Sequence, residues 1–347
     1  FQLCGLPFFH QSTNEMKKFK IMSLLLLCIC LQLQAQPYGS YEPAKRMRII
    51  IDNDFSGDVD GLFQLAHHLM CPSVDIRGII GSHLTAWPGS NEDDPAVMNS
   101  TPRAVAKARE VVKLMGIDVP VVAGAENQLT AFNEPQPSEG ARLIIREAMR
   151  TDTDVPLYVV CGASLTDVAS AWLMEPEIEK RITVVWIGGR EYDGMKLPAP
   201  DTDLLEFNHQ LSMKSVELVF NRSQIPLWQV PRDAYRQCIM SLDEVETDIR
   251  PCGRIGQYLA DQLSASLWSA MGEVYIMGDS PLVLLTALQT GFHPDPSSSQ
   301  YVLRPAPTIL PDGRYQDNPQ GRLIRVYTHL DTRLMFADLK GKLKRFK

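Results

Sequence analysis

The sequence predicts an α/β fold in which helices cover both faces of a mostly parallel central sheet. Short apolar runs typical of buried strands alternate with segments whose apolar residues recur at helical spacing. Such repeated strand–helix units favour a parallel sheet. The chain has 347 residues, of which 45% are hydrophobic and 22% charged. That composition is typical of a globular protein and excludes a disordered, collagen-like or coiled-coil chain.

The predicted strands are apolar runs, and two of them end at residues of interest. The run 48–52 ends in carboxylates, and the run 182–187 is followed by Gly188 and Gly189. The other predicted strands are 74–81, 119–122, 157–160, 225–230, 301–303 and 323–328.

Helices are predicted between these runs. The helix 102–115 has Thr101 as a possible N-cap and Pro102 at its first helical position. Two long polar loops, 85–99 and 191–203, have lengths that are more often functional than idle. No domain boundary emerges, so we expect a single domain over 36–347. The other predicted helices are 62–70, 140–150, 165–174, 212–220, 253–271 and 282–288.

Residues 1–35 are predicted to be an upstream extension followed by a secretory signal peptide. Basic residues precede the apolar run Ile21–Leu31, and the small residue Ala35 follows it. A membrane anchor is the less favoured alternative, because the run is short of the ~20 residues that a membrane span needs. We therefore expect an exported protein, periplasmic or secreted, without a membrane partner.

The net charge limits which partners the chain can bind, and the cysteine content limits which disulfides it can form. The formal net charge of −7 argues against non-specific nucleic-acid binding, which needs a basic surface. Cys71, Cys161, Cys238 and Cys252 lie outside the predicted leader. An even number permits disulfides in an exported chain, and Cys238 could pair with Cys252, but buried thiols are the favoured interpretation.

An acidic cluster follows the first predicted strand: Asp52, Asp54, Asp58 and Asp60. In an open parallel sheet, ligands bind beyond the carboxyl ends of the strands. Clustered carboxylates repel one another unless a cation lies among them, and hard oxygen ligands suit calcium or magnesium. The alternative is an acidic turn that caps the next helix, which accounts for one or two of these residues. The cluster therefore favours a metal site.

Four ordered segments, and in addition the C-terminal tail, resemble motifs of the inosine/uridine-preferring nucleoside hydrolases. The acidic cluster resembles their N-terminal signature, Asp-x-Asp-x-Gly-x-Asp-Asp. The tail from Ile324 to Asp331 resembles the closing strand, so the resemblance spans residues 46 to 342. The other segments are Cys161–Asp167, which resembles a strand-end turn ending in Leu-Thr-Asn, Glu206–Asn208, which resembles the Glu-Phe-Asn ribose motif, and Asp279–Leu282, which resembles His-Asp-Pro-Leu.

This resemblance implies the fold of that family and a reaction. The reaction is calcium-dependent hydrolysis of the N-glycosidic bond of a nucleoside, or of a related riboside, by a metal-activated water. A homo-oligomer is an open expectation, since the family often forms dimers or tetramers. By resemblance, Asp54 is the metal-bound general base, Asp60 and Asp279 are further calcium ligands with a strand-end carbonyl near Cys161, Asp58 binds the ribose hydroxyls or the ion, and Glu206 and Asn208 bind the sugar.

The chain departs from the family pattern at two glycines. The paired aspartates of the signature are Asp60 and Gly61 here, and the histidine before the distal aspartate is Gly278. The leaving-group acid is therefore missing. His83, after the strand 74–81, is a candidate for that role, with a surface-loop histidine as the alternative. These departures leave two other functions open: a non-catalytic, metal-dependent ribose- or nucleoside-binding protein, and a hydrolase of another glycoside.

Overall fold

The computed structural model describes residues 43–86, 90–91, 93–195, 204–266, 272–288 and 298–346. The predicted leader, 1–35, lies outside these residues, as do parts of the loops 85–99 and 191–203. Residues Ala44–Lys347 form one compact unit. The predicted single-domain α/β fold is confirmed.

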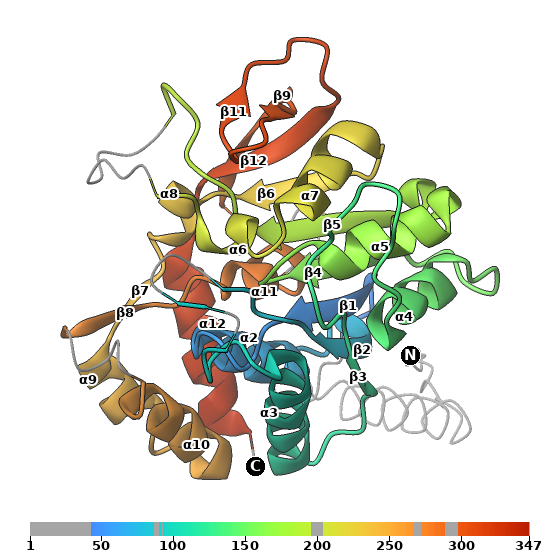
Figure 1. Ribbon diagram of the computed structural model, residues 1–347. Coiled ribbons are helices and arrows are strands. Elements are labelled where there is room, and N and C mark those ends of the chain that lie inside the picture. Colours follow the sequence, from blue (N-terminus) through green and yellow to red (C-terminus); the bar gives the residue numbers. More distant parts are fainter. Residues whose placement is uncertain are drawn as a thin grey trace, which may run out of the picture. The chain divides into compact units, whose positions relative to one another are not determined.

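The central sheet has eight strands in the order β3-β2-β1-β4-β5-β6-β12-β9 (Figure 1). Every neighbouring pair is parallel except β12 and β9, which run antiparallel. Because β1 lies between β2 and β4, its end is enclosed on both sides. The strands are β1 (Met47–Asn53), β2 (Val74–Gly81), β3 (Val121–Ala123), β4 (Leu157–Cys161), β5 (Ile182–Ile187), β6 (Leu227–Val230), β9 (Gln300–Pro305) and β12 (Leu323–His329).

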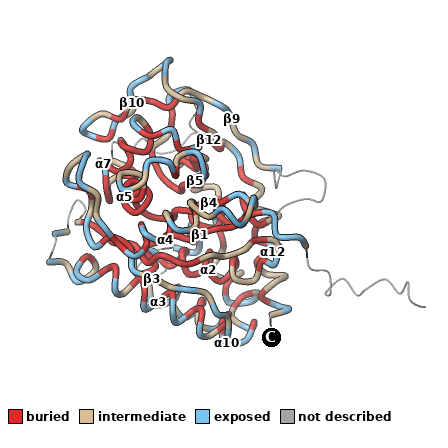
Figure 2. The backbone as a smooth tube through the Cα atoms, turned by 90° about the vertical axis from the view of Figure 1, so that its right-hand side faces the viewer, coloured by how far each residue is buried: buried red, intermediate tan, exposed pale blue. Residues whose placement is uncertain are grey.

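Both faces of the sheet are buried, which explains why its strands are continuous apolar runs. Along β1, Ile49 and Ile51 belong to one core cluster and Ile50 belongs to the other, as the two-residue period of a strand requires. Figure 2 shows buried residues along the sheet and exposed residues mainly in the outer loops and helices.

Helices cover each face. One core cluster includes residues of α2 (Asp60–Leu69), α3 (Ser100–Met115), α10 (Gly253–Ser264), α11 (Pro281–Thr286) and α12 (Thr332–Arg345). The other includes residues of α4 (Glu139–Ala148), α5 (Thr166–Met174), α7 (Met213–Glu217) and the π-helical turn η2 (Leu218–Arg222).

Several elements differ from the prediction. The helix predicted over 212–220 is divided between α7 and η2, and α12 was not predicted. The side chain of Asp331 caps α12 by accepting a hydrogen bond from the Leu334 amide. Further elements that the pattern did not predict are α6 (Phe207–Gln210), α8 (Arg232–Tyr235), α9 (Leu242–Glu244), η1 (Pro176–Lys180), η3 (Val245–Ile249), and the strand pairs β7 (Ile239–Ser241) with β8 (Val274–Ile276) and β10 (Thr308–Ile309) with β11 (Tyr315–Gln316).

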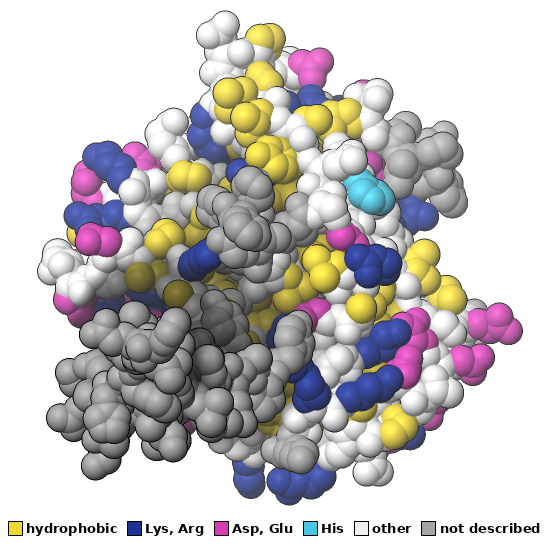
Figure 3. Space-filling model, turned by 180° about the vertical axis from the view of Figure 1, so that it is seen from behind, with side chains coloured by type: hydrophobic (Ala, Val, Ile, Leu, Met, Phe, Trp, Pro, Cys, Tyr) yellow, Lys and Arg dark blue, Asp and Glu magenta, His cyan; other side chains and the backbone are white. Residues whose placement is uncertain are grey.

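The four cysteines that the structure describes are free and buried, so the preference for buried thiols is confirmed. Within the described ranges, every helix is too short or too polar to cross a bilayer. Figure 3 shows one face of the surface, on which basic side chains lie among acidic and apolar ones.

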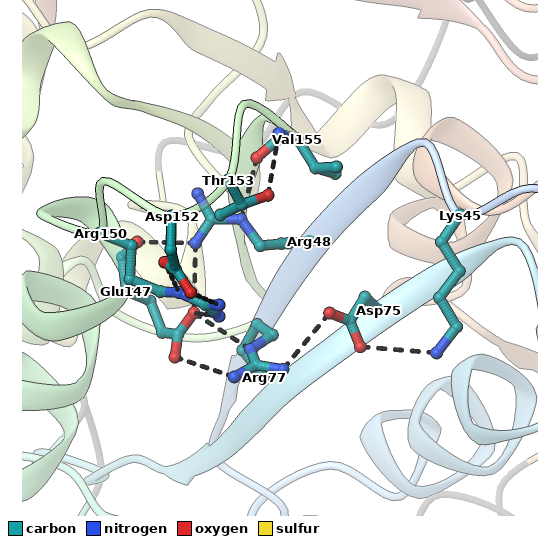
Figure 4. A network of polar contacts seen from close by, with 9 residues as sticks. All are labelled: Lys45, Arg48, Asp75, Arg77, Glu147, Arg150, Asp152, Thr153 and Val155. Atoms are coloured by element: carbon teal, nitrogen blue, oxygen red, sulfur yellow. Dashed lines mark hydrogen bonds and ion pairs between the residues drawn. The ribbon is translucent and has the colours of Figure 1, made fainter.

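A polar network ties β1, β2 and α4 together at the amino ends of the strands (Figure 4). The buried guanidinium of Arg48 donates to the carbonyl oxygens of Glu147 (2.7 Å) and Val155 (2.9 Å). It also pairs with the Glu147 carboxylate at 3.1 Å, which Arg77 contacts at 3.0 Å and Arg150 at 3.2 Å. The network stabilises the sheet at the edge opposite the acidic cluster.

Replacing Arg48 with methionine is expected to lower the free energy of unfolding by about 1–3 kcal/mol. The variant loses the two hydrogen bonds to carbonyl oxygens, whereas Glu147 keeps two arginine partners. Chemical denaturation measures the change. The control is Arg142→Met, which removes an exposed ion pair to Glu139 and should change stability by less than about 0.5 kcal/mol. Equal effects in both variants would contradict a stabilising role.

Candidate active site

The predicted site residues gather at the carboxyl edge of the sheet, although they are distant in sequence. Asp54 directly follows β1. The backbone N–H of Asp279 donates to the Asp60 carboxylate at 2.9 Å. The Asn208 amide group donates to the carbonyl oxygens of Gly162 (3.0 Å) and Ile187 (2.9 Å), which links α6 to the ends of β4 and β5. Four segments therefore converge on the end of β1.

Asp54 has the environment of a general base. Its side chain is buried, with 5% of the residue exposed, and no described side chain hydrogen-bonds its carboxylate. Burial raises the pKa of Asp54 well above the usual value, and the charges of Asp58 and Asp60 raise it further. A Cβ atom at Gly57 would lie 3.1 Å from a carboxylate oxygen of Asp54, so the glycine leaves room for that carboxylate.

Asp60 and Asp279 are held by N–H donors. Asp60 accepts from the backbone of Asp279 and, at 3.1 Å, from the backbone of Gly61. The Asp279 carboxylate accepts from the side-chain amide of Asn53 at 2.8 Å. Burial raises the pKa of Asp279; the Asn53 hydrogen bond opposes this, and the charge of Asp54 adds to it. The electrostatic effect of Asp54 on Asp279 indicates that the two carboxylates lie near each other.

Asp58 is exposed, and its carboxylate accepts a hydrogen bond from the Tyr275 hydroxyl at 2.7 Å. Helix capping does not explain the acidic cluster. The N-cap of α2 is Val59, which provides no side-chain hydrogen bond. Asp60 lies in the first turn of α2 and accepts a hydrogen bond from the Gly61 N–H, so the capping alternative accounts for this carboxylate but not for Asp52, Asp54 and Asp58.

Glu206 uses its carboxylate to join protein segments. Its Oε1 accepts from the Asn208 amide (3.2 Å) and the Tyr235 hydroxyl (3.1 Å). Its Oε2 accepts from the amides of Gly189 (2.7 Å) and His209 (3.0 Å). A carboxylate offers about four lone-pair positions, so these donors occupy them. The direct sugar contact expected of Glu206 stays a prediction, whereas its role in holding α6 against the end of β5 is evident.

His83 is fully buried, so the surface-loop alternative is wrong. Its Nε2 lies 2.9 Å from the Thr166 hydroxyl and its Nδ1 lies 3.2 Å from the Thr85 hydroxyl. Burial lowers the pKa of His83 to about 4, so the ring is neutral at neutral pH and carries no proton suited to general-acid catalysis. These contacts favour a role in tying the end of β2 to the β4–α5 turn.

Cys161 lies in the core, and burial raises the pKa of its thiol. This opposes a thiolate ligand and leaves only the backbone near Cys161 as the predicted contributor to the site. Sequence reasoning missed Asn53, Tyr235 and Tyr275. Asn53 stands inside the signature, but which group its amide would contact depends on the distant Asp279.

The carboxylates of the acidic cluster do not converge on one point as the implied calcium site would require. Ligand oxygens at about 2.3–2.6 Å from one ion lie within roughly 5 Å of one another. In the described part of the acidic cluster, no three carboxylates provide atoms within 4.8 Å of each other. Gly61 supplies no carboxylate, and an N–H group of Asn53 contacts Asp279. Calcium binding at Asp54, Asp60 and Asp279 stays a prediction.

A different group of side chains could hold a metal ion: His67, Cys71 and Asp338, between α2 and α12. The imidazole of His67 lies 2.8 Å from the Asp338 carboxylate, which also pairs with Lys342. Burial raises the pKa of the Cys71 thiol to about 12, which disfavours the thiolate that a metal needs. Nε2 of His67 and the Cys71 thiol have hydrogen-bond partners, whereas the buried Nδ1 of His67 has none among the described residues, and no ion is identified.

A cavity of about 590 Å³ is lined by residues between positions 84 and 136, none of which belongs to the acidic cluster. The Thr85 hydroxyl, which lines it, contacts His83, and the Ser56 hydroxyl donates to the carbonyl of the lining residue Ser100 at 3.0 Å. The lining is rich in amide and hydroxyl groups, among them Thr85, Asn99, Ser100, Asn127, Gln128 and Gln136.

Comparison with known protein families identifies the family of this chain. The family described as inosine-uridine preferring nucleoside hydrolase matches residues 49–306. The chain belongs to the inosine-uridine preferring nucleoside hydrolase family. The nucleoside hydrolase match includes the acidic cluster, the β4–α5 turn, Glu206 and Asp279, and so confirms the resemblance. A search of curated protein sequences gave no match.

Solved structures of nucleoside hydrolases share the fold. A plant nucleoside hydrolase aligns with a TM-score of 0.65 at 16% identity, over 86% of this chain and 99% of that chain. The inosine-uridine preferring nucleoside hydrolase of Bacillus anthracis aligns with a TM-score of 0.62 at 15% identity, over 86% and 99%. The purine-preferring ribonucleoside hydrolase of Gardnerella vaginalis aligns with a TM-score of 0.64 at 17% identity, over 86% and 98%.

Replacing Glu206 with glutamine is expected to lower the free energy of unfolding by about 1–3 kcal/mol. In glutamine, an NH₂ group takes the place of one carboxylate oxygen. The two N–H or O–H donors that bonded to that oxygen then face another donor, so these buried groups lose their acceptor. Denaturation followed by circular dichroism measures this. The matched control is Glu134→Gln at an exposed position. A variant as stable as the control would show that Glu206 does not hold α6 in place.

Proposed function

We propose that this nucleoside hydrolase family member cleaves the N-glycosidic bond of nucleosides or related ribosides, with Asp54 as general base. The observation that carries the proposal is the Asp54 carboxylate, which is buried, free of described side-chain partners and raised in pKa. A base is most effective when its pKa lies near the working pH. Its position beyond β1 is also where ligands bind in open α/β sheets.

The proposed step uses groups of this chain. Asp54 accepts a proton from a water molecule as the water oxygen bonds to the anomeric carbon and the bond from that carbon to nitrogen breaks. Positive charge develops on the sugar, and the carboxylates of Asp60 and Asp279 offset it electrostatically. The departing base takes a proton from solvent, since Gly278 offers none. Calcium, which the resemblance implies, is not part of this step because the oxygen ligands do not fit it.

The cavity lined by Thr85 and Ser100 suits the aglycone. Its amide and hydroxyl lining can hydrogen-bond a polar ring, while Asn208 retains its Oδ1 as an acceptor for a sugar hydroxyl. The relatives differ in the bases they prefer, being described as inosine-uridine preferring and purine-preferring. We propose that the substrate is a riboside, and the proposal does not specify its base. Export after removal of residues 1–35 and formation of a homo-oligomer remain parts of the proposal.

Gly61 and Gly278 favour a second candidate, a ribose- or nucleoside-binding protein without catalysis. Both glycines stand where the family has functional side chains. Calorimetry with ribose and turnover assays with inosine, uridine and p-nitrophenyl riboside separate the two functions. Ribose binding without turnover of any of these compounds would select the binding protein.

Replacing Asp54 with asparagine should lower kcat by about 10²–10⁴-fold, because the amide cannot accept the water proton. KM should change less than kcat, since the amide keeps one acceptor oxygen in a nearly isosteric side chain. Steady-state kinetics on the riboside panel measures both constants. The control Asp317→Asn changes a side chain that is 96% exposed and should retain full activity. Equal activity in Asp54→Asn would remove Asp54 from the mechanism.

The rate should fall at low pH with an apparent pKa well above the usual aspartate value of about 3.9. The raised pKa of Asp54 means that protonation disables the base at pH values at which an ordinary aspartate is still ionised, and activity returns as the pH rises through that pKa. A profile of kcat/KM against pH tests this. An acidic limb near the usual aspartate value would show that Asp54 is not the base.

A further inference from the structure

The side-chain amide of Asn53 has a fixed orientation at the centre of the acidic cluster. Asn53 is fully buried at the end of β1. Its Oδ1 accepts from the Asp54 backbone N–H at 2.8 Å. Its Nδ2 therefore faces two acceptors, Asp279 at 2.8 Å and Gln64 at 3.3 Å. The flipped amide would place an oxygen against both acceptors and an NH₂ group against an N–H donor, so the network excludes it.

Two glycines make the space for this amide. A Cβ atom at Gly61 would lie 3.0 Å from Nδ2 of Asn53 and 3.3 Å from the Asp279 carboxylate. A Cβ atom at Gly162 would overlap Nδ2 of Asn53. Position 61 is where the family signature has its second aspartate. The Asn53 amide and a carboxylate at 61 would thus compete for the same space, and the glycine resolves the conflict in favour of the amide.

The N–H groups around the acidic cluster provide positive charge of the kind that a bound cation provides in other clusters of carboxylates. Asp279 accepts from Asn53, and Asp60 accepts from the backbones of Asp279 and Gly61. Each bond directs the positive end of a dipole at a carboxylate, and hydrogen bonds to charged groups are the stronger class. A divalent ion placed beside Asp279 would instead face the positive hydrogens of the Asn53 amide.

We infer that the Asn53 amide, in the space left by Gly61 and Gly162, replaces the divalent ion in this chain, so that the acidic cluster binds its sugar without calcium. The sugar part of this statement rests on the proposed function. The hydroxyl donors of the sugar then bind directly to acceptors that the protein leaves open, the Asp54 carboxylate and Oδ1 of Asn208.

The test is a calcium titration of the chelator-stripped full chain, followed by calorimetry and by the thermal midpoint Tm. We expect no binding heat and no rise in Tm, even when calcium exceeds the Kd of about 10⁻³ M of weak extracellular sites. Stoichiometric binding with a rise in Tm in the wild-type chain would overturn the inference. This measurement needs no substrate, so it is independent of the proposed activity.

Asn53→Asp provides the converse measurement. The new carboxylate faces Asp279, so Tm should fall in chelator and rise when calcium is added. Asn133→Asp adds the same charge at an exposed position and should show neither effect. If Asn53→Asp does not fold, the wild-type titration still decides the question. If calcium does not change the Tm of Asn53→Asp, the Asn53 side chain does not occupy the place of a divalent ion, and the inference is wrong.

Activity separates the two hypotheses. Riboside turnover that persists in chelator supports both the proposed function and the replacement of the ion. Turnover that requires added calcium keeps the function and overturns the replacement. Absence of turnover, with no calcium binding by titration, removes the proposed function but supports an ion-free cluster.

Discussion

The structure at the carboxyl edge of the sheet depends on how the buried carboxylates beyond β1 are stabilised. Asp54, Asp60 and Asp279 are buried at this edge, and buried carboxylates are costly unless charges or hydrogen-bond donors compensate them. For Asp60 and Asp279 the donors are backbone N–H groups and one side-chain amide, whereas no described side chain donates to the Asp54 carboxylate. The β1 register, the start of α2 and the segment before α11 must therefore stay together, since each supplies part of this compensation.

The same constraint divides the site residues into two kinds. Glu206 and His83 have all their polar atoms engaged by the protein and hold the ends of β2, β4 and β5 in place. In the described part of the chain, in contrast, no other residue hydrogen-bonds the Asp54 carboxylate, and no donor contacts Oδ1 of Asn208. A rigid frame around a few unengaged acceptors is the arrangement expected of a preorganised polar site.

Sequence patterns predicted the fold well because strands buried on both faces appear as uninterrupted apolar runs. The prediction for β2, residues 74–81, matches the observed strand. The helix α12 was missed although Met335, Leu339 and Leu343 recur at helical spacing, because charged residues surround them. The short pairs β7–β8 and β10–β11 carry too few residues for a periodic signal.

The sequence supplied candidate site residues, whose roles stay predictions, but it did not supply their contacts. The ordered motifs identified Asp54, Glu206, Asn208 and Asp279. The partner of Asn53, however, lies more than two hundred positions away, and its effect depends on the space at Gly61. Likewise, nothing local in the sequence indicates that four donors fill the carboxylate of Glu206. Such contacts arise only when separate segments pack together.

The hydrogen bond between Tyr275 and Asp58 joins a peripheral strand pair to the mouth of the acidic cluster. Two-stranded sheets of this size are marginally stable by themselves, so β7 and β8 open more readily than the central sheet. Each opening releases Asp58 from its anchor. Ligand binding to the acidic cluster and hydrogen-exchange protection of β7 and β8 are thereby thermodynamically linked. A bound molecule that holds Asp58 in place also makes the opening of these two strands less frequent.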